Sequence, residues 1–280
     1  MIGSFVDSFS LFGTTYLVGL LAAVALAQVG IWVVARNQIF LGAAVAQAST
    51  LGVAVALGAA SLAGGAALAW LASPALPLLL AVLASVATAW IVGRPRSAQS
   101  ESAEALNGWV FLASSSVPVL LLAHSPHGLE EIQRLMFSTL LTASPLDLAL
   151  FALLAAAGVV LTATASGPLL LFSVDPESAR AFGMDTARWR ALAALWLGLA
   201  VGLAIRSAGT LFAFGCLVLP PLAAKGLCRE VQRMAWVAPA LGGAAALAGF
   251  FLGHGFDVPP AHATVALLAG AVALSWLRRR

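Results

Sequence analysis

Two clusters of histidines and carboxylates have the side chains from which a metal site could be built. The first comprises His124, His127, Glu130 and Glu131, and the second comprises His254, Asp257 and His262. Imidazole nitrogens and carboxylate oxygens are common ligands of zinc and related divalent cations. These residues are therefore candidate metal ligands. The alternative is that they are solvated loop residues, and that His262, at the start of an apolar segment, is a packing residue.

No arrangement typical of an enzyme accompanies these clusters. The sequence contains no HExxH, and Glu130-Glu131-Ile132-Gln133-Arg134 is one residue shorter than the EExxxR motif of intramembrane proteases. A GxxxxGK[ST] phosphate loop is also absent, and Lys225 is the only lysine. We therefore expect no enzymatic activity and no ATP hydrolysis from this chain.

The composition places these residues in a membrane protein. Of the 280 residues, 61% are hydrophobic and 9% are charged, whereas a soluble domain carries about 25% charged residues. The mean hydropathy is +1.01. Apolar runs of about 18 residues or more, each long enough to span a bilayer, recur along the chain. Continuous Ala, Leu, Val and Gly runs favour helices over a barrel, so we predict an all-α, polytopic bundle in a single domain, residues 1–280.

Eight or nine crossings are predicted from these runs. They cover residues 13–35, 39–58, 74–93, 106–123, 146–166, 191–206, 209–226, 236–253 and 260–277. The small-residue segment 59–73 is a candidate broken or re-entrant piece, and 129–142 is a candidate short helix. With nine crossings the N-terminus and the C-terminus would lie on opposite sides, and with eight they would lie on the same side.

Basic residues mark alternate loops between the predicted spans. They are Arg36, Arg94, Arg96, Arg180, Arg188, Arg190, Lys225, Arg229, Arg233 and Arg278 to Arg280. The positive-inside rule assigns these loops and the C-terminus to the cytoplasm, with Arg134 and Arg206 as exceptions. Arg206 lies at a span end and is expected to snorkel to the interface. Because the positive charges fall in short loops between spans, the net charge of +3 does not indicate nucleic-acid binding.

The longest strongly charged stretch, residues 172–190, contains residues that typically begin and end a short helix. Asp175 can cap its N-terminus, Pro176 suits the first helical position, and Gly183 suits the C-terminal cap. A helix of about two turns would lie outside the bilayer and expose charges and Phe182. Two interpretations remain: an ordinary solvated loop, or a helix that receives force from a cytoplasmic partner.

The segments around this stretch resemble a known family. Residues 205–225 form a span interrupted by Gly209 and ending in Pro220-Pro221. This order of charged loop, glycine turn and prolines resembles the permease subunits of ABC importers for zinc, manganese and iron and, more distantly, siderophore and cobalamin permeases. Residues 32–52, 141–148 and 256–265 resemble the family segments "R…fxGdxlaHaslpG", "T.eDl" and "yDlPxGaxiv". The resemblance covers nearly the whole chain.

The resemblance implies a type II ABC importer permease in a bacterial inner membrane. Such a permease pairs with a second copy or a related chain, receives substrate from an extracytoplasmic binding protein, and is driven by cytoplasmic ATPase subunits that bind ATP and magnesium. No cofactor is expected on this chain itself. The ATPase would contact the loop through Asp175, Glu177, Arg180, Phe182, Gly183 and Arg188.

The sequence departs from the family at the segment implied to line the pathway. Family members carry an Asp and a His four residues apart there, whereas this chain has Ala43 and Gln47, with Ser49 close by. A neutral amide is a poor ligand for zinc. Either the cargo is not a bare cation but a metal chelate or a small polar molecule, or a heterodimeric partner supplies the missing ligands.

Three other classes are weaker alternatives. An ion-coupled secondary transporter would place ionisable residues near the bilayer midplane, and the predicted spans contain almost none. A membrane-embedded enzyme lacks the motifs discussed above. A purely structural membrane subunit is the third alternative.

Overall fold

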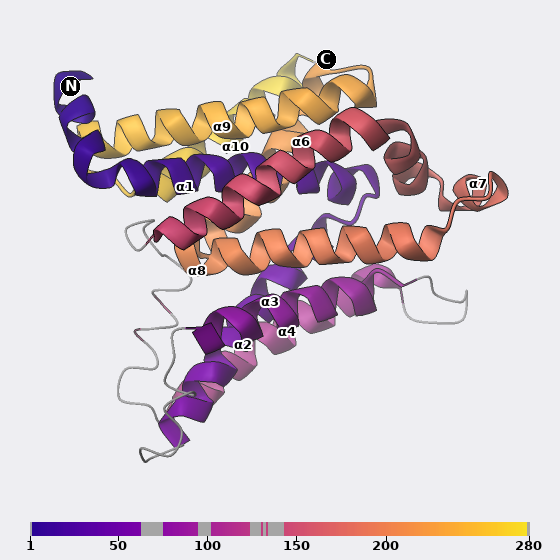
Figure 1. The fold of residues 1–280 in the computed structure, drawn as a ribbon, viewed down its shortest axis with the longest axis horizontal. Coiled ribbons are helices and arrows are strands. Elements are labelled where there is room, and N and C mark those ends of the chain that lie inside the picture. The colour runs from indigo at the N-terminus through magenta and orange to yellow at the C-terminus, as the bar shows by residue number, and fades with distance from the viewer. Residues whose placement is uncertain are drawn as a thin grey trace.

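The structure, a computed structural model, describes residues 2–62, 75–94, 102–123, 130, 133 and 143–278 (Figure 1). The regular elements in these ranges are helices: α1 (Ile2–Ala35), α2 (Ile39–Leu62), α3 (Ala75–Val92), α4 (Ala103–Leu122), α6 (Pro145–Val174), α7 (Pro176–Ala181), α8 (Thr186–Leu227), α9 (Val231–Phe256) and α10 (Pro260–Leu277). Eight of them, all except α7, are long and apolar enough to cross a membrane. The predicted polytopic helical bundle is confirmed. Of the predicted segment 59–73, residues 59–62 continue helix α2 and the rest lies outside the described residues. The predicted segment 129–142, apart from Glu130 and Gln133, lies outside them as well.

Helix α8 is divided into two arms at Gly209. This glycine has φ 79° and ψ 167°, a conformation essentially restricted to glycine. Both ends of α8 lie beside the end of α1, because Arg190 shares a cavity with Arg36 while Ala224 packs with Val34. In Figure 1 the first arm runs from the α7 side of the molecule to the opposite side. The chain therefore crosses the bundle and returns within α8, as the predicted spans 191–206 and 209–226 require.

The second arm of α8 lies at the centre of the bundle. Phe212, Cys216 and Leu217 are fully buried there. The backbone carbonyl of Leu217 lies so close to Gly30 of α1 that a Cβ on Gly30 would clash with it. Pro221 has no N–H to donate to this carbonyl, so the carbonyl is turned toward the space that the glycine leaves open. Small residues here allow the helices to approach closely without a hydrophobic driving force from lipid.

One predicted helix end was wrong, and two prolines expected at a helix end lie inside a helix. The span predicted at 146–166 continues as α6 to Val174, with a break at Ala165 (φ −126°, ψ 22°) three residues before Pro168. The span predicted at 209–226 agrees with the second arm of α8, which ends at Leu227, but Pro220-Pro221, expected at the end of the span, lie inside this arm. Each proline removes one backbone hydrogen bond and bends a helix. In membrane helices the neighbouring helices compensate for this loss, so a proline need not be an end.

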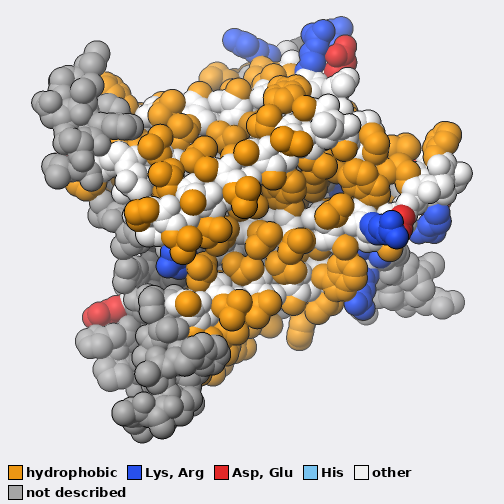
Figure 2. Space-filling view, viewed as in Figure 1, with side chains coloured by type: hydrophobic (Ala, Val, Ile, Leu, Met, Phe, Trp, Pro, Cys, Tyr) orange, Lys and Arg blue, Asp and Glu red, His pale blue; other side chains and the backbone are white. Residues whose placement is uncertain are grey.

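The basic residues of the predicted loops lie at one end of the bundle, which we call the basic end. Among the described residues it carries Arg36, Arg94, Arg180, Arg188, Arg190, Lys225, Arg229, Arg233 and Arg278. Figure 2 shows arginine and lysine side chains gathered along the edges near α7 and the C-terminal helices, with apolar side chains covering the helices between. The alternation of basic loops predicted from the sequence therefore corresponds to one physical face of the protein.

Candidate functional site

The N-terminus of α7 is held by Asp175. Its Oδ1 accepts hydrogen bonds from the backbone N–H groups of Glu177 (3.2 Å) and Ser178 (3.0 Å), and its Oδ2 accepts one from the Ser178 hydroxyl. The Ser178 hydroxyl and the two backbone N–H groups lower the pKa of Asp175 from its ordinary value. The cap is therefore fully charged at neutral pH and is lost only as the pH falls through this lowered pKa. The predicted N-cap is confirmed.

The C-terminus of α7 is closed by a Schellman motif around Gly183. The N–H of Met184 donates to the carbonyl of Ala179 (3.0 Å), and the N–H of Gly183 donates to that of Arg180 (3.0 Å). Gly183 has φ +80°, which suits glycine at this position. The helix spans six residues, so its length and both caps agree with the prediction. A second cap follows at once, because Asp185 accepts from the N–H groups of Ala187 and Arg188 at the start of α8.

The six residues proposed to contact a partner are all exposed, and they project from the basic end. They are Asp175, Glu177, Arg180, Phe182, Gly183 and Arg188. Phe182 is 79% exposed, although it lies outside the long apolar helices, at the C-terminal end of α7. Two caps and short connections to α6 and α8 fix the direction in which this aromatic ring projects. The loop is therefore short, ordered by local bonds, and continuous with two long helices.

The three residues predicted for the pathway all belong to α2, but they do not share one face. Ala43 and Gln47 are separated by one helical turn and lie on the same face. Ser49 follows Gln47 by two positions and points to another side of the helix, where it is fully buried. Ala43 is buried and Gln47 is partly exposed. The Ala43–Gln47 face therefore offers one neutral amide and no charged ligand.

Two of the candidate metal ligands meet at the end opposite to the basic end. His254 and Asp257 line a cavity of about 430 Å³ together with Tyr16 of α1. Asp257 ends α9 in the left-handed conformation (φ 55°), which Asp tolerates better than most residues. Among the residues that the structure describes, no three His, Cys, Asp or Glu side chains are placed to hold a metal ion together. His262 of α10 does not line this cavity.

The first predicted metal cluster falls almost entirely outside the described residues. His124 and His127 lie there. Glu130 is described and exposed. Metal binding by either cluster therefore stays a prediction.

An ion pair that the sequence did not predict joins α6 to α8. Arg206 donates through Nη2 to Oδ1 of Asp147. Asp147 is 2% exposed and also accepts from the N–H (2.9 Å) and hydroxyl (2.7 Å) of Ser144. Arg206 was expected to snorkel, but one of its nitrogens is bound to this carboxylate. The signal that could have revealed the pair is that two charged residues lie at the ends of apolar spans on the same side.

Comparisons with known proteins agree with this arrangement. The sequence of residues 8–279 matches the ABC 3 transport family. The chain is 33% identical over 90 residues to "Manganese import system permease protein ScaB" of Streptococcus gordonii, covering 32% of each chain. It is 26% identical over 145 residues to "Probable metal transport system membrane protein" of Thermotoga maritima, covering 52% of this chain and 51% of that one. The alignments thus span about a third and about a half of the curated relatives' own lengths.

Solved structures share the fold. The structure "PsaBC from Streptococcus pneumoniae in complex with Fab" superposes with a TM-score of 0.80 at 19% identity, covering 99% of this chain and 95% of that chain. An inward-facing structure described as an ABC transporter of metal-chelate type gives a TM-score of 0.72 at 18% identity, covering 98% of this chain and 89% of that chain.

The bundle, the divided helix α8 and the capped helix α7 define a multi-pass membrane protein with the fold of an ABC transporter permease. The chain belongs to the ABC 3 transport family.

Proposed function

We propose that this chain is the membrane-spanning subunit of an ATP-driven importer that moves a divalent metal ion or a metal complex across a bacterial inner membrane. The observation that carries the proposal is α7, an exposed helix with both ends capped, in a member of the ABC 3 transport family that has no phosphate loop of its own. ATP hydrolysis belongs to a separate ATPase on this proposal. The basic end and the C-terminus face the cytoplasm by the positive-inside rule.

The proposed mechanism is alternating access driven through α7. A partner ATPase binds the exposed face of α7 and moves it when ATP binds and is hydrolysed. Because α7 is joined directly to α6 and α8, a displacement of α7 shifts the basic ends of both helices. The break at Gly209 lets the two arms of α8 change their mutual angle, which opens one end of the pathway and closes the other. A second permease chain completes the pathway, and a binding protein delivers substrate at the opposite end.

The substrate class is supported by the curated relatives, one named for manganese import and one for metal transport. The neutral pair Ala43 and Gln47 limits this proposal, since neither residue carries a charged donor for a bare cation. A metal chelate, another small polar solute, or a heterodimer whose partner supplies the ligands are consistent with this pair.

Removing the exposed aromatic ring of α7 tests the coupling. In a complex purified with its partner ATPase, Phe182→Ala should weaken retention of the ATPase by about tenfold or more, because a few residues at the centre of an interface often carry most of its binding energy. Trp276→Ala is the matched control, since Trp276 is 58% exposed on the apolar helix α10. Equal ATPase retention by the two variants would contradict the proposed role of α7.

Uptake into vesicles tests the substrate. The complex built on this chain as a homodimer should import a bare cation poorly, because the Ala43–Gln47 face provides no charged ligand. The measurement is ATP-dependent accumulation of radiolabelled zinc or manganese, compared with the same vesicles supplied with the metal in chelated form. Robust uptake of the bare cation would exclude the explanation that the cargo is a chelate or an organic solute.

A further inference from the structure

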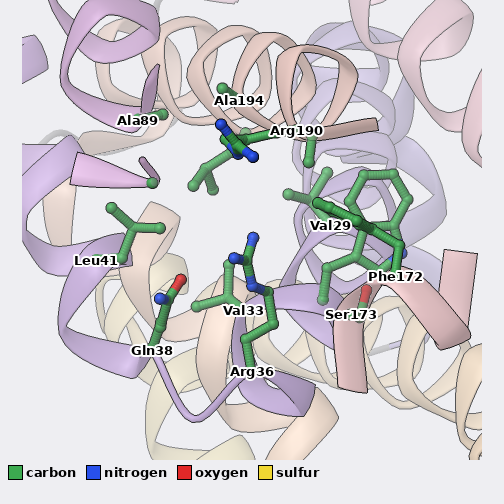
Figure 3. A pocket seen from close by; sticks show the side chains of 14 residues that line it. Val29, Val33, Arg36, Gln38, Leu41, Ala89, Phe172, Ser173, Arg190 and Ala194 are labelled. Atoms are coloured by element: carbon green, nitrogen blue, oxygen red, sulfur yellow. The ribbon is translucent and has the colours of Figure 1, made fainter. Parts of the chain in front are cut away.

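A cavity at the basic end brings two arginines together. It lies where the ends of α1, α3 and α6 meet the start of α8, and its walls include Val33, Ala89 and Leu197. Figure 3 shows the guanidinium groups of Arg36 and Arg190 projecting into it from opposite sides, with the Gln38 amide beside them. The cavity has a volume of about 30 Å³, room for about two water molecules. A space of this size can admit about two oxygen atoms of an anionic group between the two guanidinium groups.

Among the residues that the structure describes, no acidic side chain balances the positive charge of the cavity. No acidic residue is among its lining residues, and within the described part of the chain neither Arg36 nor Arg190 takes part in an ion pair. The nearby Asp185 is engaged by Arg188 at 2.9 Å. Burial, and secondarily the charge of Arg190, lowers the pKa of Arg36 from its ordinary value. Each of two like charges in a partly buried site disfavours the charged form of the other, and a bound anion would relieve this repulsion.

The arginine on α1 is held in place by an aromatic ring. The guanidinium carbon of Arg36 lies 5.3 Å from the centroid of Phe172, and Phe172 is buried. This cation–π contact fixes the guanidinium without neutralising it. The planar N–H donors of arginine match the geometry of phosphate oxygens, which they often bind in a bidentate manner.

The cavity lies at the ends of apolar helices, where the headgroups of the surrounding lipids are expected. Its walls are formed by the last residues of apolar helices α1, α3 and α6 and the first turns of α8. Trp32 also lines it, and tryptophan is enriched at the level of the headgroups. Basic pockets between membrane helices on the cytoplasmic side are typical binding sites for anionic lipid headgroups.

We propose that Arg36 and Arg190 form a binding site for a phosphate group, either the headgroup phosphate of a phospholipid or free inorganic phosphate. The bound phosphate bridges α1 and α8 and neutralises the two guanidinium groups. Because Phe172 and Ser173 lie three and two residues before Asp175, the N-cap of α7, the site adjoins α7. Occupancy would therefore hold together the helix ends that carry α7. This site is independent of the substrate of transport.

The experiment uses the full-length chain, delipidated in a phosphate-free detergent. Its thermal stability is titrated with inorganic phosphate, with short-chain phosphatidylglycerol, and with diacylglycerol of the same chain length as the phosphate-free control, all at constant ionic strength set with sodium chloride. We expect a saturable rise in melting temperature with at least one of the two phosphate ligands. For Arg36→Gln/Arg190→Gln the half-saturating concentration should increase about tenfold or more.

Two further variants separate binding from folding. Arg229→Gln removes one exposed charge from the same end, outside the cavity, and should respond to phosphate as the wild type does. Arg190→Gln alone should leave the unliganded chain at least as stable as the wild type, because it removes a like-charge repulsion, while weakening the phosphate response. If Arg190 had only a structural role, its loss would instead lower the stability of the unliganded chain.

The outcomes are distinct. Stabilisation by phosphatidylglycerol alone identifies a lipid headgroup, and stabilisation by inorganic phosphate as well identifies a general phosphate site; both support the proposal. No response to either ligand beyond the diacylglycerol and chloride controls would overturn it. So would a double variant that responds as strongly as Arg229→Gln.

Discussion

Gly209→Ala should destabilise the chain by about 1–3 kcal/mol and abolish most ATP-driven uptake. At φ 79° and ψ 167° an L-residue is strained. The variant must either bear this strain or rotate into the ordinary helical region. A continuous helix of 42 residues would be about 63 Å long at 1.5 Å per residue, about twice the thickness of a bilayer core. The second arm could then no longer return to the basic end.

The control for this prediction is Gly270→Ala. Gly270 lies in α10, and a Cβ there would meet open space, so the variant tests the same chemical change without the special backbone conformation. In a helix interior this exchange is expected to be neutral or slightly stabilising. The measurements are the melting temperature of the purified chain and uptake by the reconstituted complex. If Gly209→Ala melted and transported like Gly270→Ala, the break would have no structural or mechanical importance.

Features with a local cause were predictable from the sequence. The caps of α7 depend on Asp175, Pro176 and Gly183, which act within a few residues of themselves, and the structure contains the bonds that these residue types favour. The interruption of the span at Gly209 was also predictable, because it depends on the conformation of the glycine itself. The grouping of arginines at one end follows from the alternation of loops along a multi-pass chain, which needs no knowledge of tertiary packing.

Features that depend on distant partners were not predictable. Pro220 and Pro221 were expected to end a helix, but packing against Gly30 and its neighbours lets the helix continue. The cavity between Arg36 and Arg190 depends on where the ends of several helices meet. Neither residue carries a local signal for this arrangement. The pathway residues show that closeness in sequence does not predict a shared helix face. Ser49 lies two positions from Gln47 in α2 and points to another side of the helix.

The Asp147–Arg206 pair joins residues that are 59 positions apart, and its consequence is the second large prediction. Arg206→Gln should destabilise the chain by about 3–5 kcal/mol, since it leaves a buried carboxylate without its counter-charge. Arg233→Gln is the matched control. Arg233 pairs with Glu230 at 3.1 Å, but both side chains are largely exposed, and an exposed pair contributes about 0–1 kcal/mol.

A double variant shows whether charge is the cause. Asp147→Asn combined with Arg206→Gln removes both charges together and should recover most of the stability lost in Arg206→Gln, because an asparagine can still accept hydrogen bonds from Ser144 and carries no charge to be buried. The measurement is the free energy of unfolding of the purified chain for the two single variants and the double variant. If the double variant were as unstable as Arg206→Gln, the contribution of Arg206 would come from packing of its alkyl chain. The electrostatic explanation would then be wrong. Recovery would show that the start of α6 is fastened to the first arm of α8 by charge, close to the glycine at which that helix divides.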